Sequence, residues 1–293
     1  MSTTYNPTAS GIAAHAEGQG TTASGRGAHA EGRITVASGI FSHAEGQVSI
    51  ASGGSSHAEG SSTTASGDYG SHAEGQSTRA SGDHGSHAEG NQTVASGHAT
   101  HAEGHYAKAV GNYSHAEGDH TTANGIASHA EGFQTITSEG AQYSHAEGEN
   151  TRTWAPSAHA EGNNTTASGI ASHAEGAGTT ASSDYGAHAE GVNSIASGNQ
   201  AHAEGNTTQA IGQQTHTEGY HTVARGGMSH AEGRETTTAL GANWSHAEGW
   251  LTQTKAQGAH AEGYQTLASV DYQHVQGKFN VEDSEGRYAD IVG

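Results

Sequence analysis

The tetrapeptide His-Ala-Glu-Gly recurs along almost the whole chain and constrains the fold more than any other feature. It begins at His15, His29, His43, His57, His72, His87, His101, His115, His129, His145, His159, His173, His188, His202, His230, His246 and His260. His216 begins a variant with Thr217 in place of Ala, and His274 begins a degraded last copy. Thirteen of the 18 intervals are 14 residues, three are 15 and two are 16. Such a period predicts a solenoid.

A second motif lies midway between the first, as in Thr21–Gly25 and Thr35–Gly39. The resulting seven-residue spacing is not a coiled-coil heptad, because apolar a and d residues are missing and each Gly would cost a helix about 1 kcal/mol. We therefore expect two short strands and two turns per coil, with coils stacked in parallel ~4.8 Å apart into a rod of roughly 85 Å. Insertions such as Asp68–Gly70, Asp83–Gly85 and Asp184–Gly186 should form loops.

Composition limits both the core and the partners. The chain has 45 Gly and only 31% hydrophobic residues, values that indicate disorder when order along the chain is ignored. The repeats overrule that reading and predict an interior of small side chains. Of 30 acidic residues, 18 are the motif Glu, and without them the net charge of −20 becomes −2. Ten basic residues argue against a nucleic-acid partner. We expect no membrane span, no signal peptide and no disulfide.

Strand alternation predicts which side chains face inward. In Ser42–Gly46, the first, third and fifth residues should share the inner face, and His43 and Glu45 the outer face. In Thr35–Gly39, the same alternation puts the first, third and fifth residues inside. Two faces of small residues can approach closely, so they should form a thin interior.

The two outward faces differ in how much they vary. The position of Val36 is occupied in other coils by Thr22, Ile50, Thr64, Arg79, Val94, Lys108, Ile195, Gln209 and Leu267, so it should face solvent. The His and Glu positions barely change, which predicts a repeated contact with other copies of the chain. The predicted subunit interface comprises His15, Glu17, His29, Glu31, His43, Glu45, His57, Glu59, His72, Glu74, His87, Glu89, His101, Glu103, His115, Glu117, His129, Glu131, His145, Glu147, His159, Glu161, His173, Glu175, His188, Glu190, His202, Glu204, His216, Glu218, His230, Glu232, His246, Glu248, His260 and Glu262.

Paired His and Glu would also perturb each other's titration. We expect each motif Glu to accept a hydrogen bond from a His, which would hold the pKa of the Glu below its ordinary value. A protonated His in such a pair would have a raised pKa, although burial acts in the opposite direction.

The pattern small-x-Ala-x-Gly over residues 9–277 resembles the head repeats of trimeric autotransporter adhesins. The resemblance implies an all-β fold, a left-handed parallel β-roll or β-solenoid of 14-residue coils in a homotrimeric rod. The His and Glu positions are usually aliphatic in those heads. The Ser-His-Ala-Glu-Gly variant resembles stalks that precede self-cleaving chaperone domains of the peptidase G2 type. Residues 278–293 resemble the start of such a domain, and residues 1–8 would be an N-terminal arm.

Other chemistries fit the repeats less well. Numerous identical coils offer no unique cleft for acid–base catalysis, so we expect no catalytic residues, no enzyme and no cofactor. His and Glu are more consistent with structural hydrogen bonds than with a metal site, although a threefold axis could trap ions. An ice-binding Thr array would be interrupted by Arg79, Lys108 and Gln209. Exposed aromatics at the turns could contact a ligand, and Trp154, Trp244 and Trp250 are the candidates.

The sequence thus predicts a structural or adhesive fibre segment that spaces or presents binding surfaces. Its partners would be itself, as a homotrimer, and a host-surface glycan or protein. The predicted location is extracellular, at a cell surface or in a virion fibre. The alternative function is a ligand-binding solenoid, such as an ion-binding or ice-binding protein.

Overall fold

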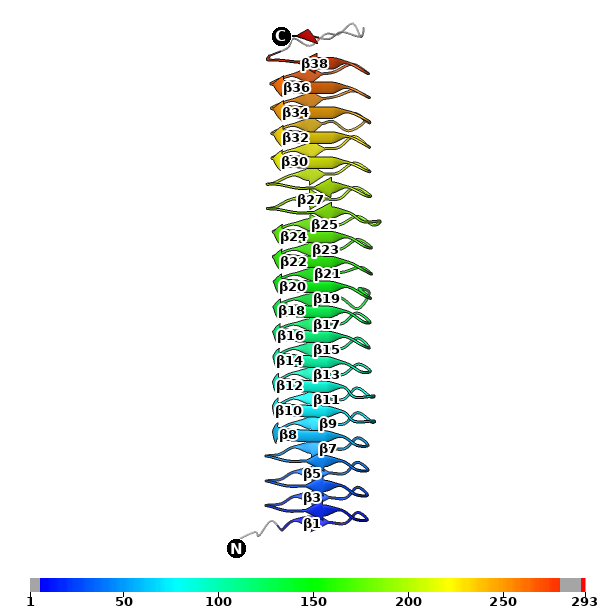
Figure 1. Ribbon diagram of the computed structural model, residues 1–293, viewed down its shortest axis with the longest axis vertical. Helices are drawn as coiled ribbons and strands as arrows, with labels where there is room; N and C mark the ends of the chain where they lie inside the picture. Colours follow the sequence, from blue (N-terminus) through cyan, green and yellow to red (C-terminus); the bar gives the residue numbers. More distant parts are fainter. Residues whose placement is uncertain (1–5, 280–290, 293) are drawn as a thin grey trace. The chain divides into compact units, whose positions relative to one another are not determined.

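The computed structural model describes residues 6–279 and 291–292, and the chain divides into two compact units, Met1–Gly148 and Glu149–Gly293. Each unit is a parallel β-solenoid whose coils contain two strands and two turns (Figure 1). The described part of the chain contains no helix of the length and hydrophobicity needed to cross a membrane. Most of the predicted C-terminal segment, 278–293, and most of the predicted arm, 1–8, lie outside the described residues.

In the first unit, odd-numbered strands carry the second motif and even-numbered strands carry His-Ala-Glu-Gly. The odd-numbered strands are β1 (Thr8–Ala9), β3 (Thr22–Ala23), β5 (Val36–Ala37), β7 (Ile50–Ala51), β9 (Thr64–Ala65), β11 (Arg79–Ala80), β13 (Val94–Ala95), β15 (Lys108–Ala109), β17 (Thr122–Ala123) and β19 (Ile136–Thr137). The even-numbered strands are β2 (His15–Ala16), β4 (His29–Ala30), β6 (His43–Ala44), β8 (His57–Ser61), β10 (His72–Gln76), β12 (His87–Asn91), β14 (His101–His105), β16 (His115–Asp119), β18 (His129–Phe133) and β20 (His145–Glu149).

The second unit follows the same order. Its odd-numbered strands are β21 (Arg152–Thr153), β23 (Thr166–Ala167), β25 (Thr180–Ala181), β27 (Ile195–Ala196), β29 (Gln209–Ala210), β31 (Val223–Ala224), β33 (Thr237–Thr238), β35 (Gln253–Thr254) and β37 (Leu267–Ala268). Its even-numbered strands are β22 (His159–Asn163), β24 (His173–Ala177), β26 (His188–Ala189), β28 (His202–Ala203), β30 (His216–Tyr220), β32 (His230–Arg234), β34 (His246–Trp250), β36 (His260–Tyr264) and β38 (His274–Gln276), and β39 (Ile291–Val292) pairs with β38.

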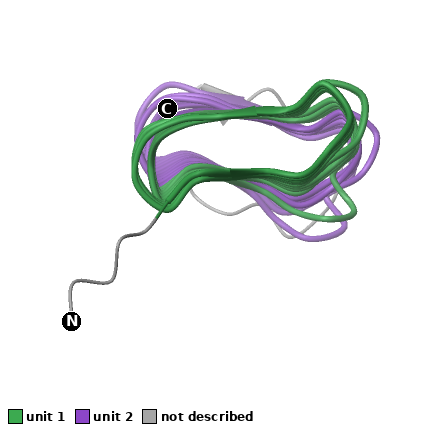
Figure 2. Ribbon diagram, turned by 90° about the horizontal axis from the view of Figure 1, so that it is seen from below, with its two compact units in different colours: residues 1–148 green, residues 149–293 purple. Residues whose placement is uncertain are grey.

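Successive coils pair in parallel and in register, as the repeat predicts. In β14 and β16, His pairs with His, Ala with Ala and Glu with Glu, and β34 and β36 pair in the same way. Each residue therefore lies over its counterpart in the neighbouring coil. Viewed along the stacking direction, the coils of each unit are flattened loops with two long sides (Figure 2).

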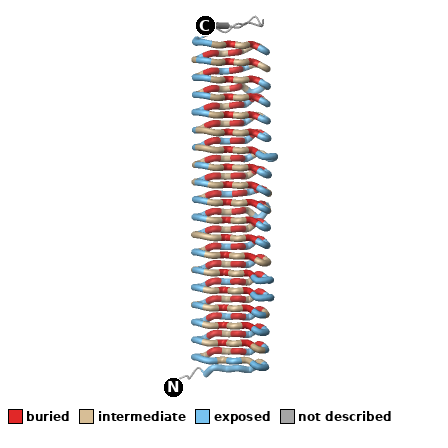
Figure 3. The backbone as a smooth tube through the Cα atoms, in the orientation of Figure 1, coloured by how far each residue is buried: buried red, intermediate tan, exposed pale blue. Residues whose placement is uncertain are grey.

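The interior of each unit is made of small side chains, as predicted. Ala37, Ala44 and Thr35 are fully buried, and Ser42 is nearly so. Buried residues alternate with half-buried or exposed ones along the strands, and exposed residues gather at the turns (Figure 3). Because a methyl or hydroxymethyl group fills the space between the two long sides, each coil buries little apolar area and depends on the neighbouring coils for its stability.

The prediction for the motif Gly was wrong. Gly46 does not face inward with Ser42 and Ala44 but is exposed at a turn, with a φ of 90°. The positive φ ends the alternation at the motif Gly even where the strand continues past it, as at Gly104 in β14, which has a φ of 106°. A Cβ on Gly46 would lie 2.2 Å from the carbonyl oxygen of Gly60 in the next coil. The position requires Gly for its positive φ and for the close approach of two backbones.

Some coils carry Thr where the others carry inward-facing Ala, and the added hydroxyl is hydrogen-bonded across the coil. A buried hydroxyl without a partner would be costly. The facing Ser of the same coil supplies that partner at 2.7–2.9 Å in three pairs: Thr137 with Ser128, Thr238 with Ser229, and Thr254 with Ser245. In these three coils the polar substitution is matched by its neighbour, whereas the buried hydroxyl of Thr217 has no hydrogen-bond partner.

The one-residue insertions form loops without interrupting the coils, as predicted. The Asp of each insertion binds the preceding coil: Asp68 Oδ1 accepts from Gly54 N at 2.8 Å, and Asp83 Oδ1 accepts from Asp68 N at 2.9 Å. Strands β9, β11 and β13 remain paired in register across these insertions. The Asp side chain thus fastens the longer turn to its neighbour.

Two adjacent residues of β5 test the assignment of faces. Ala37→Leu should overpack the interior and cost roughly 1–3 kcal/mol locally, because the two long sides cannot separate without breaking pairing in the neighbouring coils. Val36→Lys, on the outward side between Thr22 and Ile50, should change local stability by less than about 0.5 kcal/mol. Hydrogen exchange of amides in β3, β5 and β7 measures both. Equal losses of protection would contradict the assignment.

Candidate functional site: the histidine–glutamate face

The motif His and Glu side chains point outward on the same side of every coil. We call these residues, the set named above as the predicted interface, the histidine–glutamate face. Along β14 the intervening Ala102 is fully buried, whereas His101 and Glu103 have side chains that are each 37% exposed. The alternation of a single strand therefore fixes the orientation of the face, as the sequence predicts.

In-register pairing stacks the imidazole rings into a ladder. In the first unit, the ring centroids of His101 and His115 are 4.8 Å apart with planes 5° from parallel. In the second unit, His202 and His216 are 4.9 Å apart with planes at 6°. The separation equals the spacing of neighbouring strands, so the backbone sets it.

Each ring also lies beside the carboxylate of its own motif. Nε2 of His129 is 3.4 Å from Oε2 of Glu131, and the same two atoms of His101 and Glu103 are 3.6 Å apart. A hydrogen bond forms between His57 and Glu45 of the preceding coil, at 3.2 Å. Several Nε2 atoms are inaccessible to solvent without a hydrogen-bond partner, among them those of His101, His115 and His188. The expected pairing of His with Glu is thus present as proximity, with longer distances than most hydrogen bonds.

The titration of the ladder differs from the expected pairing of opposite charges. Burial, followed by the charge of a neighbouring His, lowers the pKa values of eight motif histidines: His43, His72, His87, His115, His129, His202, His230 and His260. Two neighbouring stacked rings that were both charged would repel each other. These histidines are therefore mostly neutral at pH 7, which is the outcome expected where burial outweighs pairing with Glu.

The glutamates behave as a ladder of like charges. Burial, with hydrogen bonds to Glu248 and Glu218, raises the pKa of Glu232 to about 7. The hydrogen bond from Glu232 in turn lowers the pKa values of Glu218 and Glu248. Carboxylates one strand spacing apart repel when both are ionised, so protonation of one of them stabilises the ionised form of the next. The expectation of a lowered pKa was wrong for six motif glutamates, whose pKa values are raised: Glu31, Glu59, Glu89, Glu131, Glu204 and Glu232.

Stability should depend on pH through both ladders. Glu232 has a folded pKa above its ordinary value of 4.5, so its contribution is complete below pH 4.5 and is lost as pH rises through about 7. The lowered His pKa values act oppositely, since their contribution is complete above pH 6.5 and is lost as pH falls through the folded pKa.

Glu232→Gln should consequently raise the melting temperature at pH 8–9 relative to the unchanged chain, and the gain should disappear towards pH 4. Thermal unfolding between pH 4 and pH 9 measures this difference. Glu139→Gln, on a turn away from the face, serves as the control. A gain that is the same at every pH would show that the Glu ladder carries no shared proton.

The ladder does not by itself converge on metal ions. His43, Glu45 and His57 offer ligand atoms within 4.8 Å of one another, and many coils repeat this grouping. Zinc bonds of about 2.0–2.2 Å allow two ligand atoms of one ion to be at most ~4.2 Å apart. Stacked rings at 4.8 Å with nearly parallel planes exceed that limit. One ring must turn before two successive histidines can bind the same ion.

Of the three candidate tryptophans, Trp250 lies in an organised cluster. It is the last residue of β34, beside Arg234 of β32 and Tyr264 of β36. The Arg234 guanidinium lies 5.0 Å from the Trp250 ring, and the Tyr264 and Trp250 rings are 4.9 Å apart. Extending one coil each way gives the aromatic–cation ladder, which comprises Tyr220, Arg234, Trp250, Tyr264 and Lys278.

Sequence reasoning named Trp250 but missed its companions. Each ladder residue directly follows the Gly of its motif in five successive repeats, and this shared position was the available signal. Trp154 and Trp244 are 52% and 53% exposed and lie at the opposite turn of their coils. Trp244 Nε1 contacts Met228 Sδ at 3.2 Å.

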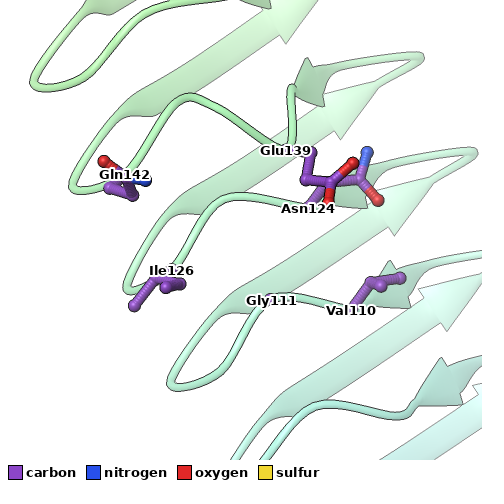
Figure 4. A pocket seen from close by; sticks show the side chains of 6 residues that line it. All are labelled: Val110, Gly111, Asn124, Ile126, Glu139 and Gln142. Atoms are coloured by element: carbon purple, nitrogen blue, oxygen red, sulfur yellow. The ribbon is translucent and has the colours of Figure 1, made fainter.

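The hollows of the surface lie at the turns. One of about 680 Å³ is lined by Val110, Gly111, Asn124, Ile126, Glu139 and Gln142, next to the longer turn of a 16-residue coil (Figure 4). Figure 4 shows Glu139 beside Asn124, with Ile126 and Gln142 on the other side of the hollow. A second hollow of about 490 Å³ borders the aromatic–cation ladder and is lined by Tyr220, His221, Arg234, Glu235, Thr237 and Leu251.

Comparison with known proteins supports the repeat assignment. The family model described as the YadA head domain repeat matches two segments, residues 88–114 and 189–215. Each segment begins at a motif Ala and ends just before a motif His, so each spans almost two coils. No curated protein matches the chain. The two matches show that these segments are similar to the repeats of adhesin heads, which agrees with the expected resemblance and with the coils of the structure.

Proposed function

We propose that this chain is one of the three chains of a trimeric surface fibre. The fibre would be a shaft or a head in which three copies pack their histidine–glutamate faces together. The observation that carries the proposal is the contrast between the two outward faces. His and Glu occupy their positions in coil after coil, whereas the position of Val36 accepts Ile50, Arg79 and Lys108. When the same residue types are required in every coil, we expect each coil to make the same contact with another copy of the chain.

The geometry of the face suits contact with a second copy. Because the backbone spaces the ladder evenly, another copy aligned in parallel presents matching groups at every coil. Glu232, whose pKa is raised to about 7, can donate a hydrogen bond when it is protonated, and Glu248, whose pKa is lowered, can accept one. This part of the face therefore offers both a donor and an acceptor to a neighbouring chain.

The choice of three chains and of location rests on resemblance. Adhesin heads of the trimeric autotransporters are homotrimers, and the matched repeat belongs to such heads. The fibre would stand outside the cell, on a bacterial surface or on a virion, and would space or present binding surfaces.

Solution mass tests the assembly. Light scattering should give three times 29.5 kDa for the unchanged chain, with the profile of an elongated particle. Combining Glu204→Lys, Glu218→Lys and Glu232→Lys should reduce the mass to that of one chain, because nine added cations would meet at the interface. The matched control combines Gln209→Lys, Val223→Lys and Thr237→Lys on β29, β31 and β33 and should remain trimeric. A monomeric unchanged chain would refute the proposal.

Ligand contact in this fibre is proposed at the aromatic–cation ladder. The exposed rings of Tyr220 and Trp250 offer stacking surfaces for sugar rings, and Arg234 between them adds donors beside the neighbouring hollow. Trp250 is central because it contacts both Arg234 and Tyr264.

Trp250→Ala should reduce binding to a glycan identified on an array by about fivefold or more, by analogy with rings stacked on nucleic-acid bases, which contribute on the order of 1–3 kcal/mol each. Tyr143→Ala removes a more exposed ring, 70% against 43% for Trp250, from a turn of the other unit and should leave binding unchanged. Binding that survives Trp250→Ala would move the ligand site elsewhere, and Trp154 and Trp244 would be the next candidates.

A further inference from the structure

A cluster of His105, Asp119 and His120 interrupts the repeat pattern in the first unit. His105 ends β14 and Asp119 ends β16, so the two residues face each other in register. The corresponding residues in the coils on either side are Asn91 and Phe133, neither of which is ionisable. The cluster is therefore confined to two coils, and it lies at a turn rather than on the histidine–glutamate face.

The two imidazoles converge on one carboxylate oxygen. His105 Nδ1 lies 3.3 Å from Asp119 Oδ1, and His120 Nδ1 contacts the same oxygen. The two rings are nearly perpendicular, at 85°, with centroids 5.7 Å apart. Both ring nitrogens thus contact Asp119 Oδ1 from different directions, unlike the parallel rings of the ladder, and an ion bound by all three groups would replace these two contacts.

The backbone and a neighbouring ring hold this arrangement. His120 N donates to the His105 carbonyl at 2.9 Å, which joins the two coils at the cluster. Tyr106 packs against both imidazoles, with centroid distances of 4.3 Å to His105 and 4.8 Å to His120. About half of each of the three side chains remains exposed, so an ion and its water ligands can enter without a rearrangement of the coil.

We propose that His105, Asp119 and His120 form a binding site for a divalent transition-metal ion of the zinc type. Two imidazole nitrogens and one carboxylate oxygen are ligands that zinc, nickel and copper favour, whereas calcium and magnesium favour oxygen alone. The 3.3 Å separation of His105 Nδ1 and Asp119 Oδ1 is within the ~4.2 Å that two zinc bonds allow. Three protein ligands leave at least one coordination position for water.

Such an ion would link two neighbouring coils at their turn. Because the cluster does not use the histidine–glutamate face, the proposal does not depend on the trimer, and either one can fail without the other.

Isothermal titration of the full chain with ZnCl₂, after removal of metal by a chelator and dialysis, tests the site. We expect one saturable site per chain, and Asp119→Asn or His120→Ala should each weaken binding by more than about tenfold, the loss that even outer-shell changes cause at metal sites. Zinc should also raise the melting temperature of the unchanged chain but not that of the Asp119→Asn variant.

Two control variants separate this cluster from other histidines. His84→Ala removes an exposed turn histidine that stacks on Tyr69 and His98, and it should leave zinc affinity unchanged. His115→Ala removes a ladder ring from the same strand as Asp119 and should also leave it unchanged. The proposal is overturned by the absence of saturable binding, by binding that Asp119→Asn does not affect, or by many equivalent sites that His115→Ala weakens.

Discussion

Parallel, in-register stacking of 14-residue coils is the constraint on which the rest of the structure depends. It places every residue directly over its counterpart in the next coil, one strand spacing away. A residue type that repeats therefore becomes a column of identical groups. The backbones approach so closely at the motif turn that a Cβ on Gly60 would lie 2.2 Å from the Gly75 carbonyl oxygen. Coils can stack this closely because the same residue types, Gly among them, recur at the same positions of each coil.

Columns of identical groups have different consequences inside and outside the coil. Stacked Ala and Thr side chains pack without conflict, and an added hydroxyl such as that of Thr254 is hydrogen-bonded to Ser245. Stacked His and Glu side chains would repel if all were charged. The chain accommodates them with neutral histidines and with carboxylates such as Glu232 that retain a proton near pH 7. The face that is most constant in sequence is thus polar but carries less charge than its composition implies.

Groups of residues that occur in only a few coils lie at the turns, where the sequence varies from one repeat to the next. The same stacking that makes columns of identical residues also brings unlike turn residues together from neighbouring coils. Arg234 meets Trp250 in this way, and His105 meets Asp119. A repetitive solenoid can therefore present different groups of turn residues at different coils. Such an arrangement is more typical of a fibre that presents binding groups than of an enzyme with one cleft.

The sequence by itself determined the coils, their parallel stacking, the buried Ala37 and Thr35 positions and the outward direction of His and Glu, because period and strand alternation fix these features. The conformation of Gly46, the long contacts between His and Glu, and the shared protons of the Glu ladder were decided only by the tertiary structure. The same is true of the cluster at Asp119. Each of these depends on where a strand ends and on distances between side chains of different coils. A pattern of residue types along one chain does not contain such distances.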